Sequence, residues 1–182
     1  MEYFLDTEFI EDGKTIDLIS IGIVAEDGRE LYAINKECDF SKASWWVVEN
    51  VLQPMGLDRS GFNKNPGDPS VSPSYRNSCL AAHPKGEIAC LVKEFVRDSP
   101  EFWAYYAAYD WVAVRQLFGT MMDLPEGFPT YCRDIKQECD RLGNPPLPKQ
   151  AEGEHNALAD ARWNKQAREF LKTYARKSLQ PE

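Results

Sequence analysis

Apolar and polar residues in the first 35 positions follow the two-residue period that is typical of β-strands. Runs of β-favouring residues occupy 2–10, 15–26 and 30–35, and the sequences EDGK and EDGR separate them. Asp-Gly pairs between apolar runs are typical of hairpin turns. The pattern therefore predicts three consecutive strands that pair as an antiparallel meander.

The rest of the chain contains helical periods and two further strand-like runs. The stretch 101–111, EFWAYYAAYDW, begins as an aromatic, buried fourth strand and leads into a helix that Gly119 closes. PTYCRDIKQECDRLG predicts a short fifth strand and a helix, and further helices are predicted at 41–52, 86–97 and about 155–176. This order predicts an α/β fold: one mixed five-stranded sheet, antiparallel meander first, with helices on both faces.

The helix predicted at 41–52 has Ser41 or Ser44 as its cap. Its packing face contains Trp46, and four of the five tryptophans of the chain are expected in the core rather than in contact with a ligand: Trp45, Trp46, Trp103 and Trp111. Residues 53–85 are rich in Pro, Ser, Asn and Gly, and loops of this length either bind ligands or hide short elements. We expect one domain over 1–182 with an irregular insertion at about 53–85.

Charge and cysteine usage narrow the class of protein. The chain has 182 residues, a net charge of −8 and a sequence pI near 4.9, which argues against coating nucleic acid through a basic surface. The negative net charge does not exclude an enzyme that binds the phosphate groups of its substrate through metal ions. Five cysteines without a CxxC pair, no long apolar run and no basic leader predict reduced thiols, a cytoplasmic location and no membrane contact.

Asp6 and Glu8 interrupt the apolar run of the first predicted strand. Side chains at positions i and i+2 of a strand point to the same face, so these two carboxylates lie side by side and repel each other. The pair is therefore either part of an exposed edge or part of a cation site.

The last predicted helix places an acid on its apolar face. A helical wheel gathers Trp163, Ala167, Phe170, Leu171 and Tyr174 on one stripe, and Asp160 falls within it. Asp160 either caps the helix locally or meets a cation. The basic residues gather on the opposite side and form either a solvated face or an attraction for a polyanion: Arg162, Lys165, Arg168, Lys172 and Arg176.

Asp110 and His155 extend this chemistry. Asp110 follows the fourth predicted strand, where it is either a helix cap or one of the ligands that collect beyond strand ends in α/β sheets. Asp6, Glu8, Asp110 and Asp160 together suggest an oxygen-ligand site for a hard divalent cation. His155 precedes Asp160 by five residues and can take a proton from water near neutral pH, or it is a plain surface histidine.

DTEF, YYAAYD and HNALAD together resemble the three motifs of the DEDDh exonucleases, the DnaQ-like branch of the ribonuclease H-like superfamily. HNALAD matches the His-x-Ala-x-x-Asp motif at His155, Ala157 and Asp160. The opening run is also similar to that of a bacterial group in this family, the polyadenylate-specific 3′-exoribonucleases. Many members have Asn where this chain has Tyr106, a difference that concerns contact with the substrate strand.

The resemblance implies hydrolysis of single-stranded RNA from its 3′ end to nucleoside 5′-monophosphates. It implies two divalent ions, Mg²⁺ or Mn²⁺, held by Asp6, Glu8, Asp110 and Asp160, with Asp6 between them. His155 is then the general base. Phe9 either contacts the terminal nucleotide or is a plain core residue.

Other functions compatible with these residues are a DNA exonuclease, because RNA is distinguished through its 2′-OH, and a scaffold or nucleic-acid-binding protein without activity. A ribonuclease H-type endonuclease fits less well, since HNALAD has the exonuclease form of the third motif. A homodimer is compatible with the family, in which related exonucleases often pair.

Overall fold

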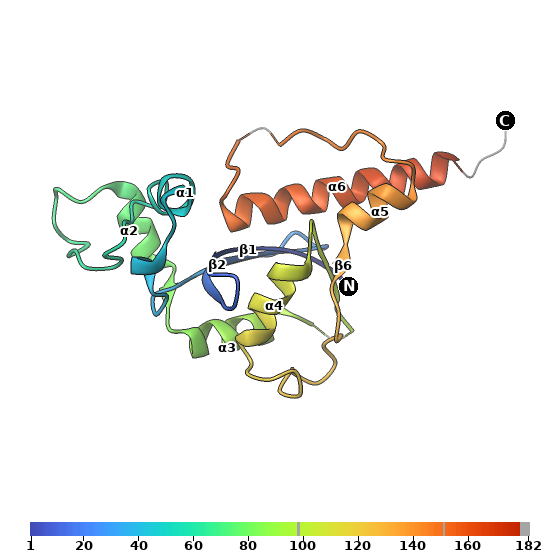
Figure 1. Ribbon diagram of the computed structural model, residues 1–182. Helices are drawn as coiled ribbons and strands as arrows, with labels where there is room; N and C mark the ends of the chain where they lie inside the picture. The colour runs from blue at the N-terminus through green and yellow to red at the C-terminus, as the bar shows by residue number, and fades with distance from the viewer. Residues whose placement is uncertain (98, 151, 179–182) are drawn as a thin grey trace.

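Six strands form one mixed sheet in the computed structural model, which describes residues 1–97, 99–150 and 152–178 (Figure 1). Their order across the sheet is β4-β3-β2-β1-β5-β6. The strands are β1 (Glu2–Glu11), β2 (Ile16–Ala25), β3 (Glu30–Asn35), β4 (Ala82–His83), β5 (Glu101–Ala104) and β6 (Arg133–Asp134). β1, β2 and β3 pair antiparallel, which confirms the predicted meander, and β5 runs parallel to β1.

Two details of the predicted sheet were wrong. The sheet has six strands rather than five, because β4 pairs with β3 over only two residues, too few for a periodic pattern. The fourth predicted strand, β5, also ends earlier than its aromatic run suggested. It stops at Ala104, and the chain turns through Tyr106, whose φ of 57° lies in the left-handed region, into the next helix.

Helices cover both faces of the sheet, as predicted. α3 (Lys85–Phe95) and α4 (Ala108–Gln116) lie on one face, and α5 (Ile135–Arg141) and α6 (Ala157–Ser178) lie on the other (Figure 1). None of the helices in the described ranges is both long and apolar enough to cross a membrane. All five cysteines are free thiols.

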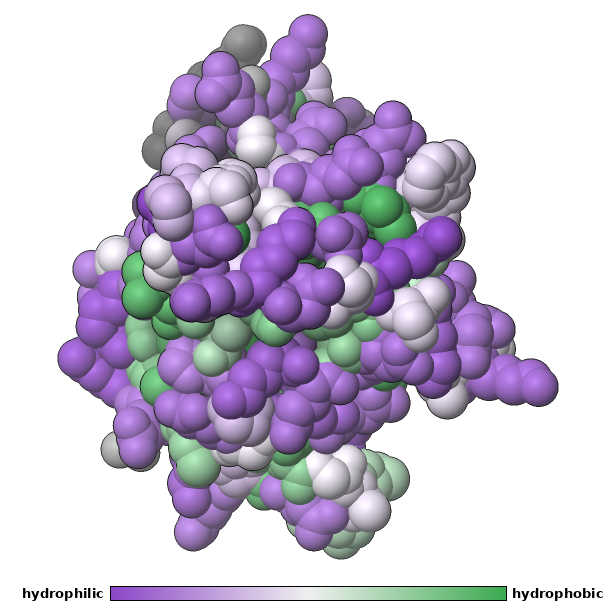
Figure 2. All heavy atoms as spheres, turned by 90° about the vertical axis from the view of Figure 1, so that its left-hand side faces the viewer, coloured by the Kyte–Doolittle hydropathy of each residue, from purple (hydrophilic) through white to green (hydrophobic). Residues whose placement is uncertain are grey.

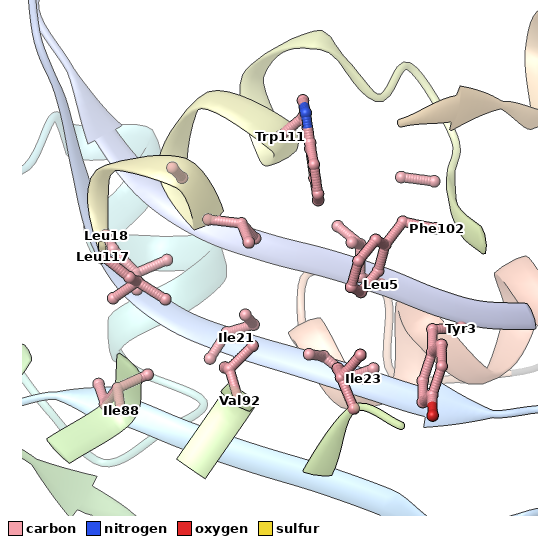
Figure 3. Packing of buried hydrophobic residues seen from close by; sticks show 14 of the residues in the cluster. Tyr3, Leu5, Leu18, Ile21, Ile23, Ile88, Val92, Phe102, Trp111 and Leu117 are labelled. Carbon is pink, nitrogen blue, oxygen red and sulfur yellow. The ribbon is translucent and has the colours of Figure 1, made fainter. Parts of the chain in front are cut away.

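Alternation along β1 divides the core into two halves. Leu5 points to the face covered by α3 and α4, where it packs with Ile21 and Val92 (Figure 3). Phe4 points to the opposite face and packs with Ala161 and Leu171 of α6. Because the side chains of a strand alternate, the two acids that follow on β1 continue the Phe4 side, beneath α6.

The buried face of α6 differs from the predicted stripe. Small residues dominate it, and the fully covered positions are Ala157, Ala161, Asn164, Ala167 and Leu171. Tyr174 remains 38% exposed, whereas Trp163 and Phe170 are partly buried. The face of α6 that packs on the sheet is therefore rotated about the helix axis relative to the face that the helical wheel predicted. The alanines on this face let the helix approach the sheet closely.

Four of the five basic residues of α6 contact other parts of the protein, while Arg162 remains 51% exposed, so the predicted basic face is only partly solvated. Arg162 forms an ion pair with Glu30 at 2.6 Å, and Lys165 donates to backbone carbonyls of β2 and the following turn. Arg168 and Lys172 both pair with the carboxylate of Glu2. These side chains fasten α6 to the sheet edge, because they neutralise partly buried acids there.

The segment after β3 forms a small helical layer at one end of the sheet. A 3₁₀ turn (Phe40–Lys42) precedes α1 (Trp45–Val47), which Ser44 caps by accepting the N–H of Val47 at 3.2 Å. The chain then winds as a π-helix (Val48–Leu52). Trp45 and Trp46 are 73% and 53% exposed, so their expected place in the core was wrong, while Trp103 and Trp111 are buried as predicted.

Part of the predicted irregular segment 53–85 is regular. α2 (Pro73–Leu80) follows Ser72, whose hydroxyl accepts the N–H of Tyr75 at 3.1 Å, and β4 comes directly after it. The face of the molecule that carries α1 and α2 is mostly hydrophilic, with small apolar areas between polar side chains (Figure 2).

Candidate active site

Three of the predicted acids meet between β1 and α6. Asp6 and Glu8 stand on the face of β1 that α6 covers, and Asp160 lies in the first turn of α6. One carboxylate oxygen from each lies within 4.8 Å of the others. The fold therefore brings the ends of the chain together into one acidic cluster.

The close approach of α6 to the sheet depends on Gly22 of β2. A Cβ atom placed on Gly22 would lie 2.2 Å from the carbonyl oxygen of Ala157 and 2.5 Å from the Cα of Leu158. Gly22 pairs with Asp6 across the β1–β2 ladder. The missing side chain on β2 thus lets the start of α6 descend beside Asp6, which sets the position of Asp160.

Burial raises the pKa values of all three acids, and repulsion between carboxylates adds to the rise for Asp6 and Glu8. Burial is the main cause for Asp6, whose pKa lies well above its ordinary value because Asp110, Glu8 and Asp160 add repulsion. The pKa of Glu8 rises to about 8, mainly through burial and then through repulsion by Asp160 and Asp110. Burial also raises the pKa of Asp160, although its hydrogen bond from Gln150 and the nearby His155 oppose the rise.

Asp110 lies on the opposite side of β1, in the first turn of α4. It does not cap that helix, since Ala107 is the N-cap residue, and it does not end a strand as predicted. Its Oδ1 accepts the N–H of Thr7 at 2.8 Å and the hydroxyl of Thr7 at 2.7 Å. Burial raises its pKa to about 6, against the lowering effect of Thr7.

Asp110 comes near Asp6 because β5 is short. The β1–β5 ladder ends at the Phe4–Trp103 pair, so the N–H of Thr7 meets no partner on β5 and is bound by Asp110 instead. Asp110 is the second cause of the raised pKa of Asp6, after burial. The fourth acid, Asp110, therefore approaches the cluster beside the part of β1 that lies beyond Phe4 and does not pair with β5.

A cleft of about 580 Å³ opens beside the cluster. The residues that line it include Asp6, Asp160 and His155 together with Tyr105 and Tyr106. A histidine that can accept a proton and a group of carboxylates that line the same space are what hydrolysis of a phosphodiester would require.

The donor set beside this cleft fits a hard divalent cation. Three carboxylates offer oxygen ligands, and their raised pKa values show that their charged forms are disfavoured in the absence of a positive charge. Asn164 also lines the cleft; its Nδ2 donates to the carbonyl of Leu5 at 2.8 Å, and its Oδ1 has no hydrogen-bond partner among the described residues. Asp6, Glu8 and Asp160 could therefore hold such an ion, with Asp110 at the edge.

His155 precedes α6 and faces the same cleft. Its φ of 65° is left-handed, and its side chain is exposed. The imidazole packs edge to face with Trp46, with ring centroids 4.7 Å apart and an interplanar angle of 79°. The structure thus places the predicted base beside the acids, at the junction with α1.

Phe9 is partly buried and lines a second cleft, of about 380 Å³, together with Glu8, Trp46 and Val51. Its ring stacks on that of Tyr109 at a centroid distance of 5.7 Å. Phe9 is thus neither fully in the core nor free, and its predicted role as a substrate contact stays a prediction.

Four residues that contact the predicted set were missed from the sequence. Thr7 binds Asp110, Gln150 donates to Asp160 at 2.7 Å, Asn164 lines the cleft and Trp46 contacts His155. Asn164 could have been found, because it lies one helical turn after Asp160 and faces the same way. The other three depend on contacts between distant segments.

Known proteins were compared with this chain, and no family model matches it. A 3′-5′ exoribonuclease of Mycobacterium tuberculosis, from strains CDC 1551 / Oshkosh and H37Rv, is 42% identical over 166 residues, which is 89% of this chain and 88% of the relative.

Solved structures of exonuclease I share the fold. E. coli exonuclease I in complex with a dT13 oligonucleotide has a TM-score of 0.61 at 12% identity, and the enzyme of Methylocaldum szegediense has 0.56 at 13%. The matches cover 97% and 98% of this chain but only 42% and 41% of those chains, so this chain spans less than half their length. With the identity and coverage of the mycobacterial relatives, these observations show that the chain belongs to the 3′-5′ exoribonucleases with the DnaQ-like fold.

Proposed function

We propose that this protein is a metal-dependent exonuclease that removes nucleotides one at a time from the 3′ end of single-stranded RNA. The observation that carries the proposal is the cluster of Asp6, Glu8 and Asp160, whose ligand oxygens lie within 4.8 Å of one another beside an open cleft. The names of the mycobacterial relatives support the direction of cleavage and the choice of RNA. The oligonucleotide bound to exonuclease I supports a single-stranded substrate.

The acids are the proposed ligands for two divalent ions, Mg²⁺ or Mn²⁺. Asp6, Glu8 and Asp160 would hold one ion, and Asp110 would share the second with Asp6. When bound, the ions lower the pKa of a water molecule and neutralise charge on the scissile phosphate. The net charge of −8 is compatible with a polyanionic substrate for this reason.

The remaining roles belong to side chains of this chain. His155 lines the cleft beside Asp160 and takes a proton from the attacking water at its imidazole. Phe9 meets the base of the terminal nucleotide in the second cleft, which Glu8 borders. Thr7 holds Asp110 in place through two hydrogen bonds.

The test is a shortening ladder from 5′-labelled oligonucleotides. Matched RNA and DNA strands, ending in oligo-A or in mixed sequence, are incubated with Mg²⁺, Mn²⁺ or EDTA. A metal-dependent ladder that shortens from the 3′ end is expected, with RNA cleaved faster. Asp6→Ala and His155→Ala should both lose it, since the first removes a ligand shared by both ions and the second removes the base.

Other outcomes would select other functions. Faster cleavage of DNA would make the protein a DNA exonuclease. Products of internal cleavage would indicate an endonuclease. A folded protein that binds Mn²⁺ and RNA without shortening any strand would be a binding protein, and full metal-dependent activity in Asp6→Ala would exclude the proposed cluster altogether.

A further inference from the structure

Trp46 is an exposed aromatic side chain at the border of the candidate site, and none of the sequence motifs includes it. It lies on α1, 53% exposed, where a large apolar ring gains little from burial. Its neighbour Trp45 is 73% exposed and lies beneath the guanidinium of Arg59 at 5.7 Å. Two adjacent tryptophans therefore have different surroundings, and Trp46 is the one that contacts His155.

The contact between Trp46 and His155 joins two segments far apart in the sequence. The N-terminal end of α6 lies next to α1 at one end of the sheet (Figure 1). The rings meet edge to face at 4.7 Å, an arrangement that aromatic pairs prefer. His155 is exposed and precedes the first residue of α6, so helix packing does not hold its side chain.

The two rings also divide the space around the acids. Trp46 and Glu8 line the smaller cleft that contains Phe9, whereas His155 and Asp160 line the larger cleft. The two rings in contact therefore belong to different clefts: Trp46 lines the proposed place of the terminal base, and His155 lines the proposed place of the attacking water.

We propose that Trp46 is a positioning residue, whose ring holds the His155 imidazole in the orientation needed to take a proton. This inference rests on the proposed function, in which His155 is the base. His155 has a left-handed backbone conformation just before α6, so its side chain does not follow the direction of the helical side chains. Contact with the Trp46 ring limits the rotation of the imidazole. Trp46 acts through His155 and takes no proton itself.

Steady-state kinetics on an RNA oligonucleotide test the role. Trp46→Ala should lower kcat by about 10–100-fold with a smaller change in KM, because a misplaced base loses alignment. Trp46→Phe should restore most of kcat, since it keeps an aromatic face. Trp45→Ala is the matched control and should leave both constants unchanged. Circular dichroism and thermal unfolding verify that each variant is folded, which the exposure of both side chains favours.

A double-mutant cycle separates positioning from direct contact with substrate. In the His155→Ala background, the residual cleavage rate is measured in single turnovers with enzyme in excess, and Trp46→Ala should cause no further loss there because the group it positions is gone. Weaker RNA binding of equal size in both backgrounds, with the cleavage rate unchanged in each, would show that Trp46 contacts the substrate base only and would overturn the inference.

A second readout needs neither metal nor activity. The chain has only two histidines, so ¹H–¹³C spectra of the imidazoles are assigned with His83→Gln. The ring current of Trp46 should change the chemical shifts of the His155 ring protons. These shifts should return toward the values of free histidine in Trp46→Ala but not in Trp45→Ala. Unchanged shifts in Trp46→Ala would overturn the contact.

Failure of this inference differs from failure of the proposed function. An active wild type, an inactive His155→Ala and an unchanged Trp46→Ala would overturn only the role of Trp46. A wild type that shortens no strand with any metal would overturn both.

Discussion

The Oδ1 atom of Asp110 accepts two hydrogen bonds from Thr7, one from its backbone N–H at 2.8 Å and one from its hydroxyl at 2.7 Å. Thr7 stands between Asp6 and Glu8 on β1, with its side chain on the opposite face. A residue without metal-binding chemistry thus ties the acid of α4 to the strand that carries the other two. Thr7 is 5% exposed and Asp110 is 6% exposed, so the contact is shielded from water.

Thr7→Val should destabilise the protein and weaken catalysis. The substitution removes the hydroxyl and leaves a buried carboxylate with one donor, which costs about 1–3 kcal/mol of unfolding free energy. Urea denaturation and the oligonucleotide assay measure the two effects. Thr7→Ser keeps the hydroxyl and should retain most of the stability and most of the activity. A Thr7→Val variant as stable and active as the wild type would show that the hydrogen bond from the hydroxyl is unimportant.

The metal-free protein should lose stability as pH rises from about 4.5 to 8. Glu8 has an ordinary pKa of 4.5 and a folded pKa of about 8, so the folded state binds more protons across this range. Its stabilising protonation is fully present below the lower value and lost as pH passes the higher one. Thermal unfolding in EDTA at several pH values measures the slope, and Glu8→Gln should flatten it.

Binding of Mn²⁺ should release protons and should be tighter at pH 8 than at pH 6. The pKa of Glu8 is raised to about 8 and that of Asp6 is also raised, so a bound cation must displace protons from these acids. Calorimetric titrations in two buffers with different ionisation enthalpies should give different apparent heats. Asp6→Asn should weaken binding strongly, and equal heats in both buffers would contradict the raised pKa values.

Removal of the ion should lower thermal stability at neutral pH. An ion present at 100 times its dissociation constant stabilises the folded state by about 2.7 kcal/mol. Addition of EDTA should therefore lower Tm in the wild type but not in Asp6→Asn, which lacks a ligand of the cluster. An equal drop in both proteins would place the stabilising ion elsewhere.

Gly22→Ala should displace the start of α6. Its Cβ would lie 2.2 Å from the Ala157 carbonyl oxygen, so either the helix or the strand must shift. We expect a loss of about 1–3 kcal/mol or more in unfolding free energy, together with weaker Mn²⁺ binding. Gly86→Ala is the control: nothing lies within 4 Å of its Cβ, and it is exposed in α3, so it should be neutral or stabilising.

Phe9→Ala should raise KM for RNA more than it lowers kcat. Loss of one stacking contact to a base costs about 1–3 kcal/mol of binding. Phe9→Tyr keeps the ring and should bind like wild type. Because Phe9 also stacks on Tyr109, the thermal stability of each variant must be measured alongside, and a stability change without a KM change would assign Phe9 to packing alone.

The sequence predicted most of the sheet because β1, β2 and β3 are long and joined by Asp-Gly turns. It also predicted that Asp6 and Glu8 share a face. α2 was missed even though Ser72 followed by Pro73 is a helix-start signal, because the surrounding residues are rich in turn formers. The two-residue strand β4 has no pattern to read.

Contacts between distant segments account for the rest. The exposure of Trp46 could not be predicted, because its short helix packs through Val48, Val51 and Leu52 instead. The rotation of α6 follows from Gly22 on another strand, which no helical wheel includes. The position of Asp110 depends on where β5 ends, and an aromatic run does not mark that end.

The site described above is complete only when α6 lies against β1 and β2. Asp160 and His155 arrive with this helix, the last of the described elements in chain order, whereas Asp6 and Glu8 belong to the first. A ribosome-bound chain that has not yet released α6 therefore carries two of the three clustered acids and lacks the proposed base. The appearance of nuclease activity during synthesis would thus show that α6 has packed against the sheet. In a refolding experiment, the time at which activity returns would measure the rate of this last assembly step.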